Sequence, residues 1–134
     1  MNLEKFTDRA KGFLQAAQTV AIRMNHQRIS PAHLLKAMIE DSEGMASGLI
    51  ARAGGQPRMV EDEVDAALGK LPAVTGGGAQ ATPGLDNDAV RVLDQAEQIA
   101  QKSGDAYVTV ERLLVALALA TTTSAGQALK AGQV

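Results

Sequence analysis

The stretch Ile29–Met38, ISPAHLLKAM, decides the fold because a close copy of it, VTVERLLVAL, occupies Val108–Leu117. Each copy places a hydroxyl residue, Ser30 or Thr109, just before a run of apolar residues spaced three and four apart. Serine and threonine are preferred at helix N-caps, and Pro31 suits the first helical position, where its missing N–H costs nothing. The two stretches therefore predict two equivalent helix starts, 79 residues apart.

The match between the two halves extends beyond these helix starts. With the same shift of 79 residues, Ala10, Leu14, Ala17, Ala21, Leu34, Leu35 and Ala37 match Ala89, Leu93, Ala96, Ala100, Leu113, Leu114 and Ala116. Self-similarity at one fixed offset indicates that a helical unit has been duplicated. Two copies are too few for a solenoid, so we expect a pseudo-twofold globule with one shared core.

Apolar periodicity predicts an all-α architecture of two repeats. Helices are expected over about 3–24, 30–41, 45–53 and 57–70, and again over about 85–102, 109–120 and 124–130. The first repeat is assigned to residues 1–71 and the second to 85–134, within one globular domain. The uncharged, Gly- and Pro-rich segment 72–84 is typical of a mobile connector. Because a counterpart of the fourth helix would begin near Val134, we expect a fragment that lacks the last helix of its second repeat.

The composition favours closely packed helices and excludes several functions. Hydrophobic residues make up 46% of the chain and aromatic residues only 2%, so the core must consist of aliphatic side chains. The absence of cysteine excludes disulfides and cysteine-based zinc sites, and is compatible with the cytosol. A net charge of −2 with mixed signs argues against nucleic-acid binding. No apolar run approaches the roughly 20 residues that a membrane-spanning helix needs.

No pattern in the chain indicates catalysis. His26 and His33 are seven residues apart across a loop, which is not the i, i+4 spacing of a helical metal pair, so we expect solvated or structurally hydrogen-bonded histidines. No nucleophile elbow is present, and the glycines at 76–78 lack the lysine of a phosphate loop. A duplicated helical bundle instead suggests shallow apolar grooves that suit extended peptide. Periodicity alone does not separate groove residues from core residues.

Several segments together resemble the N-terminal Clp repeat domain of the ClpB family, which comprises bacterial AAA+ disaggregases. They include MNLEKFTDRAKGFLQAAQ at 1–18, KLPAVTGGGAQ at 70–80 and VTVERLLVALAL at 108–119. The resemblance covers residues 1–134. It implies an all-α, pseudo-twofold pair of four-helix repeats, tethered by a mobile linker above the two ATPase rings of a homohexamer.

The resemblance also implies a function and its partners. Such a domain binds unfolded or aggregated proteins through an apolar groove and helps pass them into the pore of its own AAA+ ring. It has no ATPase activity and holds no cofactor, because ATP and Mg²⁺ belong to the AAA+ modules of the parent protein. We expect a cytoplasmic location, a monomeric isolated domain, and neither nucleic acid nor membrane as a partner.

The resemblance further implies three polar site residues, Thr7, Asp105 and Glu111. Each also has a structural interpretation: Thr7 as a helix cap, Asp105 as a loop brace, and Glu111 as a carboxylate that complements the helix dipole. For the apolar groove we predict the side chains of Leu14, Val90, Leu93, Val110 and Leu114.

One departure from a related family favours the ClpB-like assignment. Clp repeat domains of the ClpC type read phosphoarginine with a glutamate at the second position of both repeated helices. Here the first copy has Ala32 and only the second has Glu111. An adaptor-docking or phosphoarginine-reading domain of a ClpA- or ClpC-type unfoldase is the alternative.

Overall fold

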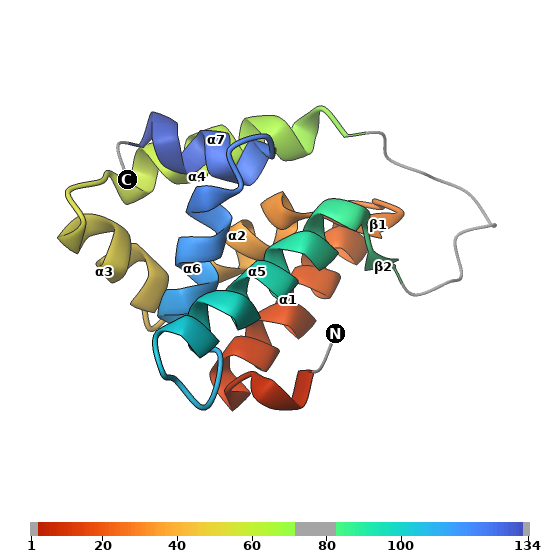
Figure 1. The fold of residues 1–134 in the computed structure, drawn as a ribbon. Helices are drawn as coiled ribbons and strands as arrows, with labels where there is room; N and C mark the ends of the chain where they lie inside the picture. The colour runs from red at the N-terminus through yellow and green to blue at the C-terminus, as the bar shows by residue number, and fades with distance from the viewer. Residues whose placement is uncertain (1–2, 72–82, 133–134) are drawn as a thin grey trace.

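The computed structural model describes residues 3–71 and 83–132, and within these ranges nearly all regular structure is helical (Figure 1). A short 3₁₀ turn, η1 (Leu3–Lys5), precedes seven α-helices and two two-residue strands. In chain order these are α1 (Asp8–Arg23), β1 (Arg28–Ile29), α2 (Pro31–Ile39), α3 (Met45–Arg52), α4 (Pro57–Gly69), β2 (Gly84–Leu85), α5 (Asn87–Lys102), α6 (Val110–Leu119) and α7 (Ser124–Ala131). The all-α prediction is confirmed.

The helix starts follow the capping chemistry of the sequence. The side-chain oxygens of Thr7, Asp86, Thr109 and Thr123 each accept a hydrogen bond from the backbone N–H three residues on, as N-caps do. The first α-helix begins at Asp8, later than the periodicity predicted, because Thr7 has extended backbone angles and caps it. The short η1 turn stands apart from α1 for the same reason.

The predicted duplication is visible in the element boundaries. A shift of 79 residues superimposes the bounds of α1 on those of α5, those of α3 on those of α7, and the start of α2 on that of α6. Contacts between the halves follow the same symmetry: α1 packs on α6 as α5 packs on α2, and α3 packs on α6 as α7 packs on α2. Helix α4 packs beside α7 (Figure 1) and has no counterpart among the described residues.

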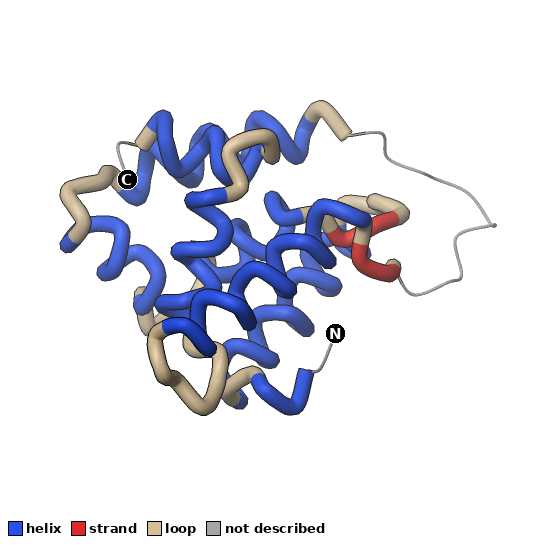
Figure 2. The backbone as a smooth tube through the Cα atoms, viewed as in Figure 1, coloured by secondary structure: helices blue, strands red, loops and turns tan. Residues whose placement is uncertain are grey.

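Two short parallel pairings join the halves, one on each side of the pseudo-dyad. Ile29 of β1 pairs with Leu85 of β2, in the two strands drawn red in Figure 2. Phe6 pairs with Val108, which is the same pair of positions with the halves exchanged. The backbone N–H of Asp86 donates to the carbonyl of Ile29 at 2.9 Å, and that of Thr7 donates to Val108 at 3.0 Å. The start of the first helix of each half is thus attached to the loop of the other half.

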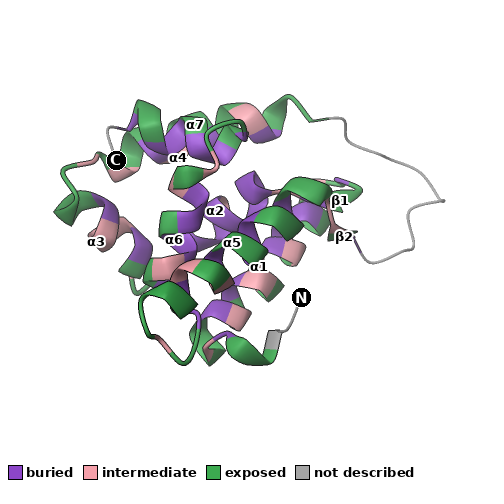
Figure 3. Ribbon diagram, viewed as in Figure 1, coloured by how far each residue is buried: buried purple, intermediate pink, exposed green. Residues whose placement is uncertain are grey.

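One core lies between the two halves, and most of the recurring residues belong to it. The buried faces of the helices are purple in Figure 3. All the matched Ala and Leu pairs are buried except for Leu14, which is half-buried. Alanine at many of these positions lets the helix backbones approach closely. Of the predicted connector 72–84, residues 72–82 lie outside the described ranges, whereas Pro83 is buried and Gly84 belongs to β2.

Candidate functional site

Thr7 and the loop that carries Asp105 meet at the Phe6–Val108 bridge. The Thr7 hydroxyl oxygen accepts from the N–H of Ala10 at 3.1 Å, and its own N–H donates to the carbonyl of Val108. The N–H of Val108 in turn donates to the carbonyl of Lys5 at 2.7 Å. Thr7 therefore caps α1 and helps to fix the loop before α6, so the helix-cap interpretation of this residue is confirmed.

Asp105 forms an ion pair that braces its loop. A carboxylate oxygen of Asp105 lies 2.9 Å from Nε of Arg112 on α6, and both side chains are about two-thirds buried. The backbone N–H of Asp105 also donates to the carbonyl of Ala100 at the end of α5. The preceding residue, Gly104, has φ 78°, a left-handed conformation that glycine adopts without strain.

We expect the Asp105–Arg112 pair to contribute modestly to stability, at about 1 kcal/mol or less, because both groups retain contact with water. A double-mutant cycle with Asp105→Ala and Arg112→Ala, measured by urea unfolding, checks this coupling. A coupling near zero would mean that the ion pair does not hold the loop.

The third polar candidate, Glu111, occupies a different environment. Glu111 is exposed in the first turn of α6, whereas Ala32, its equivalent on α2, is buried. The two repeats therefore do not present a matched pair of carboxylates at these positions. A ligand that needs two such anchors finds only one in this chain.

Three of the predicted groove residues are in the core. Leu93 has no exposed surface, and Val110 and Leu114 are nearly as buried. Leu93 and Leu114 belong to the matched set that both halves bury, so they pack inward. The prediction that these three side chains line an exposed groove is wrong. Leu14 remains half-buried and Val90 is 41% exposed, so both stay accessible to a ligand.

Leu14 lines a shallow pocket of about 270 Å³ between α1 and the β1–β2 pair. Its apolar lining comes from Leu14, Ile29, Pro83 and Leu85, and its polar lining from Lys11, Gln15 and Gln18. The side-chain amide of Gln18 donates to the carbonyl of Pro83 at 3.4 Å across the pocket. Ile29, Pro83 and Leu85 were not predicted from the sequence, because they come together only when the two halves pair.

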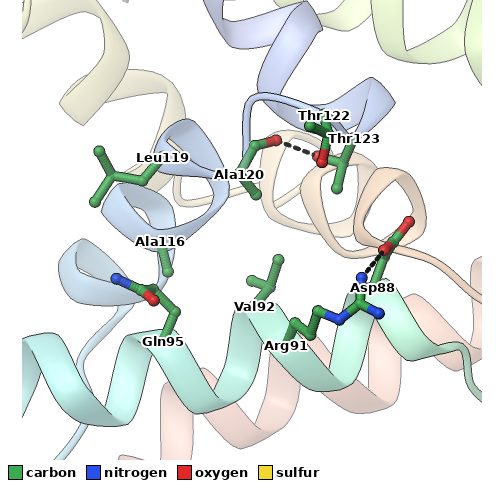
Figure 4. Close-up of a pocket in the computed structure, with 9 residues that line it drawn as sticks. All are labelled: Asp88, Arg91, Val92, Gln95, Ala116, Leu119, Ala120, Thr122 and Thr123. Atoms are coloured by element: carbon green, nitrogen blue, oxygen red, sulfur yellow. Dashed lines mark hydrogen bonds and ion pairs between the residues drawn. The ribbon is translucent and has the colours of Figure 1, made fainter.

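Two further clefts occupy equivalent places in the two halves. In the second half a cleft of about 260 Å³ lies between α5, α6 and the turn before α7 (Figure 4). Val92 and Ala116 face each other across it, with the Asp88–Arg91 ion pair at one end, and Leu119 also lines it. In the first half, the equivalent residues of α1 and α2 line a cleft of about 420 Å³, in which Glu40 replaces Leu119.

An ion cluster joins α2 to α4 beside the apolar core. Nζ of Lys36 lies 2.8 Å from a carboxylate oxygen of Asp65 and 3.2 Å from one of Glu61, both on α4. Burial alone would lower the pKa of Lys36, but hydrogen bonds to the two carboxylates raise it overall. The equivalent of Lys36 on α6 is the partly exposed Val115, so this ion cluster is confined to the first half.

The described residues show neither a cluster of metal ligands nor a membrane-spanning helix. Residues 3–71 and 83–132 contain no cluster of three or more potential metal ligands of the His, Cys, Asp or Glu type. No helix in these ranges combines the length and hydropathy that crossing a bilayer requires.

The chain is similar to chaperone sequences over its whole length. It is 50% identical over 134 residues to the chaperone protein ClpB of Rhodopseudomonas palustris, which covers all of this chain and 15% of that protein. It is 47% identical over 130 residues to ClpB of Agrobacterium fabrum, which covers 97% of this chain and again 15% of the relative. The chain thus spans about 15% of the length of the curated relatives that it matches.

Solved structures share the fold. The N-terminal domain of Hsp104 from Candida albicans superimposes with a TM-score of 0.81 at 25% identity, covering 97% of this chain and 83% of that one. The N-domain of ClpV from Vibrio cholerae gives a TM-score of 0.73 at 15% identity, covering 91% and 70% of the two chains. The model of the Clp repeat (R) N-terminal domain matches residues 5–132. The chain therefore belongs to the Clp repeat (R) N-terminal domain family.

Proposed function

We propose that this domain binds unfolded or aggregated polypeptide weakly and helps deliver it to the pore of an AAA+ ring. The observation that carries the proposal is the shallow apolar pocket at Leu14, in a domain whose relatives are named chaperones. The domain itself is non-catalytic in this proposal. ATP and Mg²⁺ are assigned to the AAA+ modules of a hexameric cytoplasmic parent, and the isolated domain is assigned as a monomer.

The lining of the pocket suits an extended chain of mixed sequence. An apolar floor formed by Leu14, Pro83 and Leu85 can take one aliphatic or aromatic side chain, and the glutamines at its rim can bond to peptide backbone. None of the lining residues supplies a buried charge that would select one particular ligand. Broad tolerance of apolar sequences follows from this chemistry.

Weak affinity follows from the small area that such a pocket can bury. Burying one or two apolar side chains yields about 2–6 kcal/mol gross, and association costs at least about 4 kcal/mol in lost freedom. The dissociation constant is therefore expected to be micromolar or weaker. Val90 and the polar residues Thr7, Asp105 and Glu111 are proposed as further contacts along the bound chain.

The test is titration of the ¹⁵N-labelled domain with a permanently unfolded protein, followed by backbone NMR shifts. We expect shifts at Leu14 and Leu85, and we expect Leu14→Ser to weaken binding about tenfold, the equivalent of 1.4 kcal/mol. This loss reflects the apolar contact that serine cannot make.

Leu119→Ser is the matched control, because Leu119 is an exposed leucine in the cleft of the second half. It should leave the affinity unchanged within twofold. Weakening by Leu119→Ser but not by Leu14→Ser would move the binding site to the other cleft. A single tight, saturable ligand with no affinity for unfolded chains would instead indicate an adaptor-docking domain.

A further inference from the structure

The α1–α2 loop and the α5–α6 loop share backbone features but carry different side chains. Asn25 and Gly104 occupy equivalent positions and both have positive φ, 60° and 78°. The next residue in each loop, His26 or Asp105, donates its N–H to the last turn of the preceding helix at 2.9 Å. In each half the side chain of this residue bonds to the residue seven positions on. The pair is His26–His33 in the first half and Asp105–Arg112 in the second.

Hydrogen bonding determines where the protons of the histidine pair lie. The backbone N–H of Ser30 donates to Nδ1 of His33 at 2.9 Å, so this nitrogen carries no proton. Neutral His33 therefore holds its proton on Nε2, which lies 2.7 Å from Nδ1 of His26 and donates to it. His26 must then carry its own proton on Nε2.

This chain of bonds disfavours a positive charge. A proton added to Nδ1 of His33 would point at the N–H of Ser30, and the Ser30 hydroxyl, 2.8 Å from the same nitrogen, would have to turn from donor to acceptor. A proton added to Nδ1 of His26 would point at the N–H of the other ring. Either event sets two donors against each other in a buried site. Burial first, and the nearby charge of His26 second, lower the pKa of His33 to about 4.

Charged groups on the surrounding elements have partners of their own. Arg23 of α1 pairs with Glu40, and Lys36 of α2 pairs with Glu61 and Asp65 of α4. Arg112 of α6 pairs with Asp105, and Arg52 of α3 donates to the carbonyl of Gly48. Lys130 of α7 is exposed to solvent. Arg28 of β1 acts on Asp86, whose pKa is nevertheless raised, chiefly by burial. A carboxyl with a raised pKa favours the folded state as pH falls, so protonation of Asp86 opposes acid opening.

We propose that the paired rings of His26 and His33 form an acid-sensitive latch that holds residues 24–30 and, through Ile29, one of the two junctions between the halves. The loop also carries β1, and the carbonyl of Ile29 accepts the N–H of Asp86. Protonation of the rings releases the loop and this junction. The opposite junction is held by an aspartate–arginine ion pair in place of the two histidines. The latch therefore acts on one side of the pseudo-dyad, and it operates whether or not the domain binds polypeptide.

The sign of the pH dependence follows from proton binding. In the released loop His33 binds a proton at an ordinary histidine pKa of about 6.5, whereas in the latched loop burial lowers the pKa of His33 to about 4. The latch is fully closed above about pH 6.5 and opens progressively as pH falls towards 4. Between pH 6.5 and pH 5, one such histidine raises the opening equilibrium by about tenfold.

Amide hydrogen exchange by NMR tests the proposal on the intact chain, after correction for intrinsic exchange rates. We expect protection of the His26 and Asp86 amides to fall about tenfold between pH 6.5 and pH 5. The equivalent amides across the dyad, Thr7 and Asp105, should keep their protection. Equal behaviour of the two junctions, or no change at Asp86, would overturn the latch.

The double variant His26→Asp with His33→Arg transplants the pair of the second half into the first and should abolish the pH dependence at Asp86. Persistence of the pH dependence in that variant would contradict the assignment. If the variant does not fold, the ¹⁵N imidazole spectrum of the native protein decides the matter. Both rings should be neutral, with the proton on Nε2, at pH 7, and a proton on Nδ1 of His33 would overturn the proposal.

Discussion

Gly126→Ala is expected to lower the free energy of unfolding by about 2 kcal/mol or more, an unusually large effect for adding one methyl group. A Cβ at this position would overlap the carbonyl oxygen of Ala120 and lie 2.7 Å from its carbonyl carbon. That carbonyl cannot move easily, because it accepts hydrogen bonds from both the N–H and the hydroxyl of Thr123. The cost of this overlap exceeds the roughly 1 kcal/mol that alanine gains over glycine in a helix.

Gly12→Ala is the matched control for this prediction. Gly12 also lies in a helix, and a Cβ there would meet nothing within 4 Å. Alanine should therefore raise the free energy of unfolding by about 0.5–1 kcal/mol through helix propensity alone. Chemical denaturation of both variants checks the pair. Similar effects at the two positions would show that the Ala120–Gly126 contact is not tight.

The turn before α7 explains why a glycine is needed in one half only. Ser47 occupies the equivalent position in α3, where a side chain is tolerated. The turn before α3 takes a different path, because its N-cap, Gly44, has φ 69° and no capping side chain, whereas Thr123 is extended and caps α7. In the second half the turn before α7 thus combines a side-chain cap, Thr123, with a glycine, Gly126, that packs against the carbonyl of Ala120.

Local patterns in the sequence predicted most of the fold, because helix periodicity and capping act within a few residues. The N-caps Ser30 and Thr109 and the 79-residue repeat all have direct counterparts in the structure. The pairings Ile29–Leu85 and Phe6–Val108 were not predicted, because each joins residues far apart in the chain through two-residue segments that carry no periodic signal. His26 and His33 are structurally hydrogen-bonded, one of the two alternatives that the sequence left open, but their contact with each other depends on the path of a loop and was not predicted.

The candidate site was harder to predict, although part of the answer was present in the repeat. Leu93 and Leu114 recur in both halves, as expected for residues that each copy must bury against the other. Val90, in contrast, matches a lysine, Lys11, and is exposed. Positions that match between the halves are mostly buried, but there are exceptions in both directions: Leu14 matches Leu93 and is half-buried, whereas Val110 differs from Pro31 and is buried. The match between the halves places Leu93 and Leu114 in the core, but it would place Leu14 there too, and it gives no sign of Pro83 or Leu85.

Leu93→Ala is therefore expected to act on stability and to lower the free energy of unfolding by about 2–5 kcal/mol. The side chain has no exposed surface and belongs to the one continuous core, so its removal loses apolar burial and leaves a cavity. The folded fraction of the variant should keep its affinity for unfolded polypeptide, because the core leucine makes no contact with a bound chain.

Val90→Ala, three residues earlier on the same helix, provides the comparison. Val90 is 41% exposed, so its truncation should change the free energy of unfolding by no more than about 0.5 kcal/mol. Denaturant unfolding of both variants measures the stability difference, and titration with the unfolded protein measures binding. A stable Leu93→Ala domain with weakened binding would contradict the burial of Leu93 and restore it to the groove. Loss of stability with unchanged affinity would place Leu93 in the core, where it supports the site only by holding the two halves together.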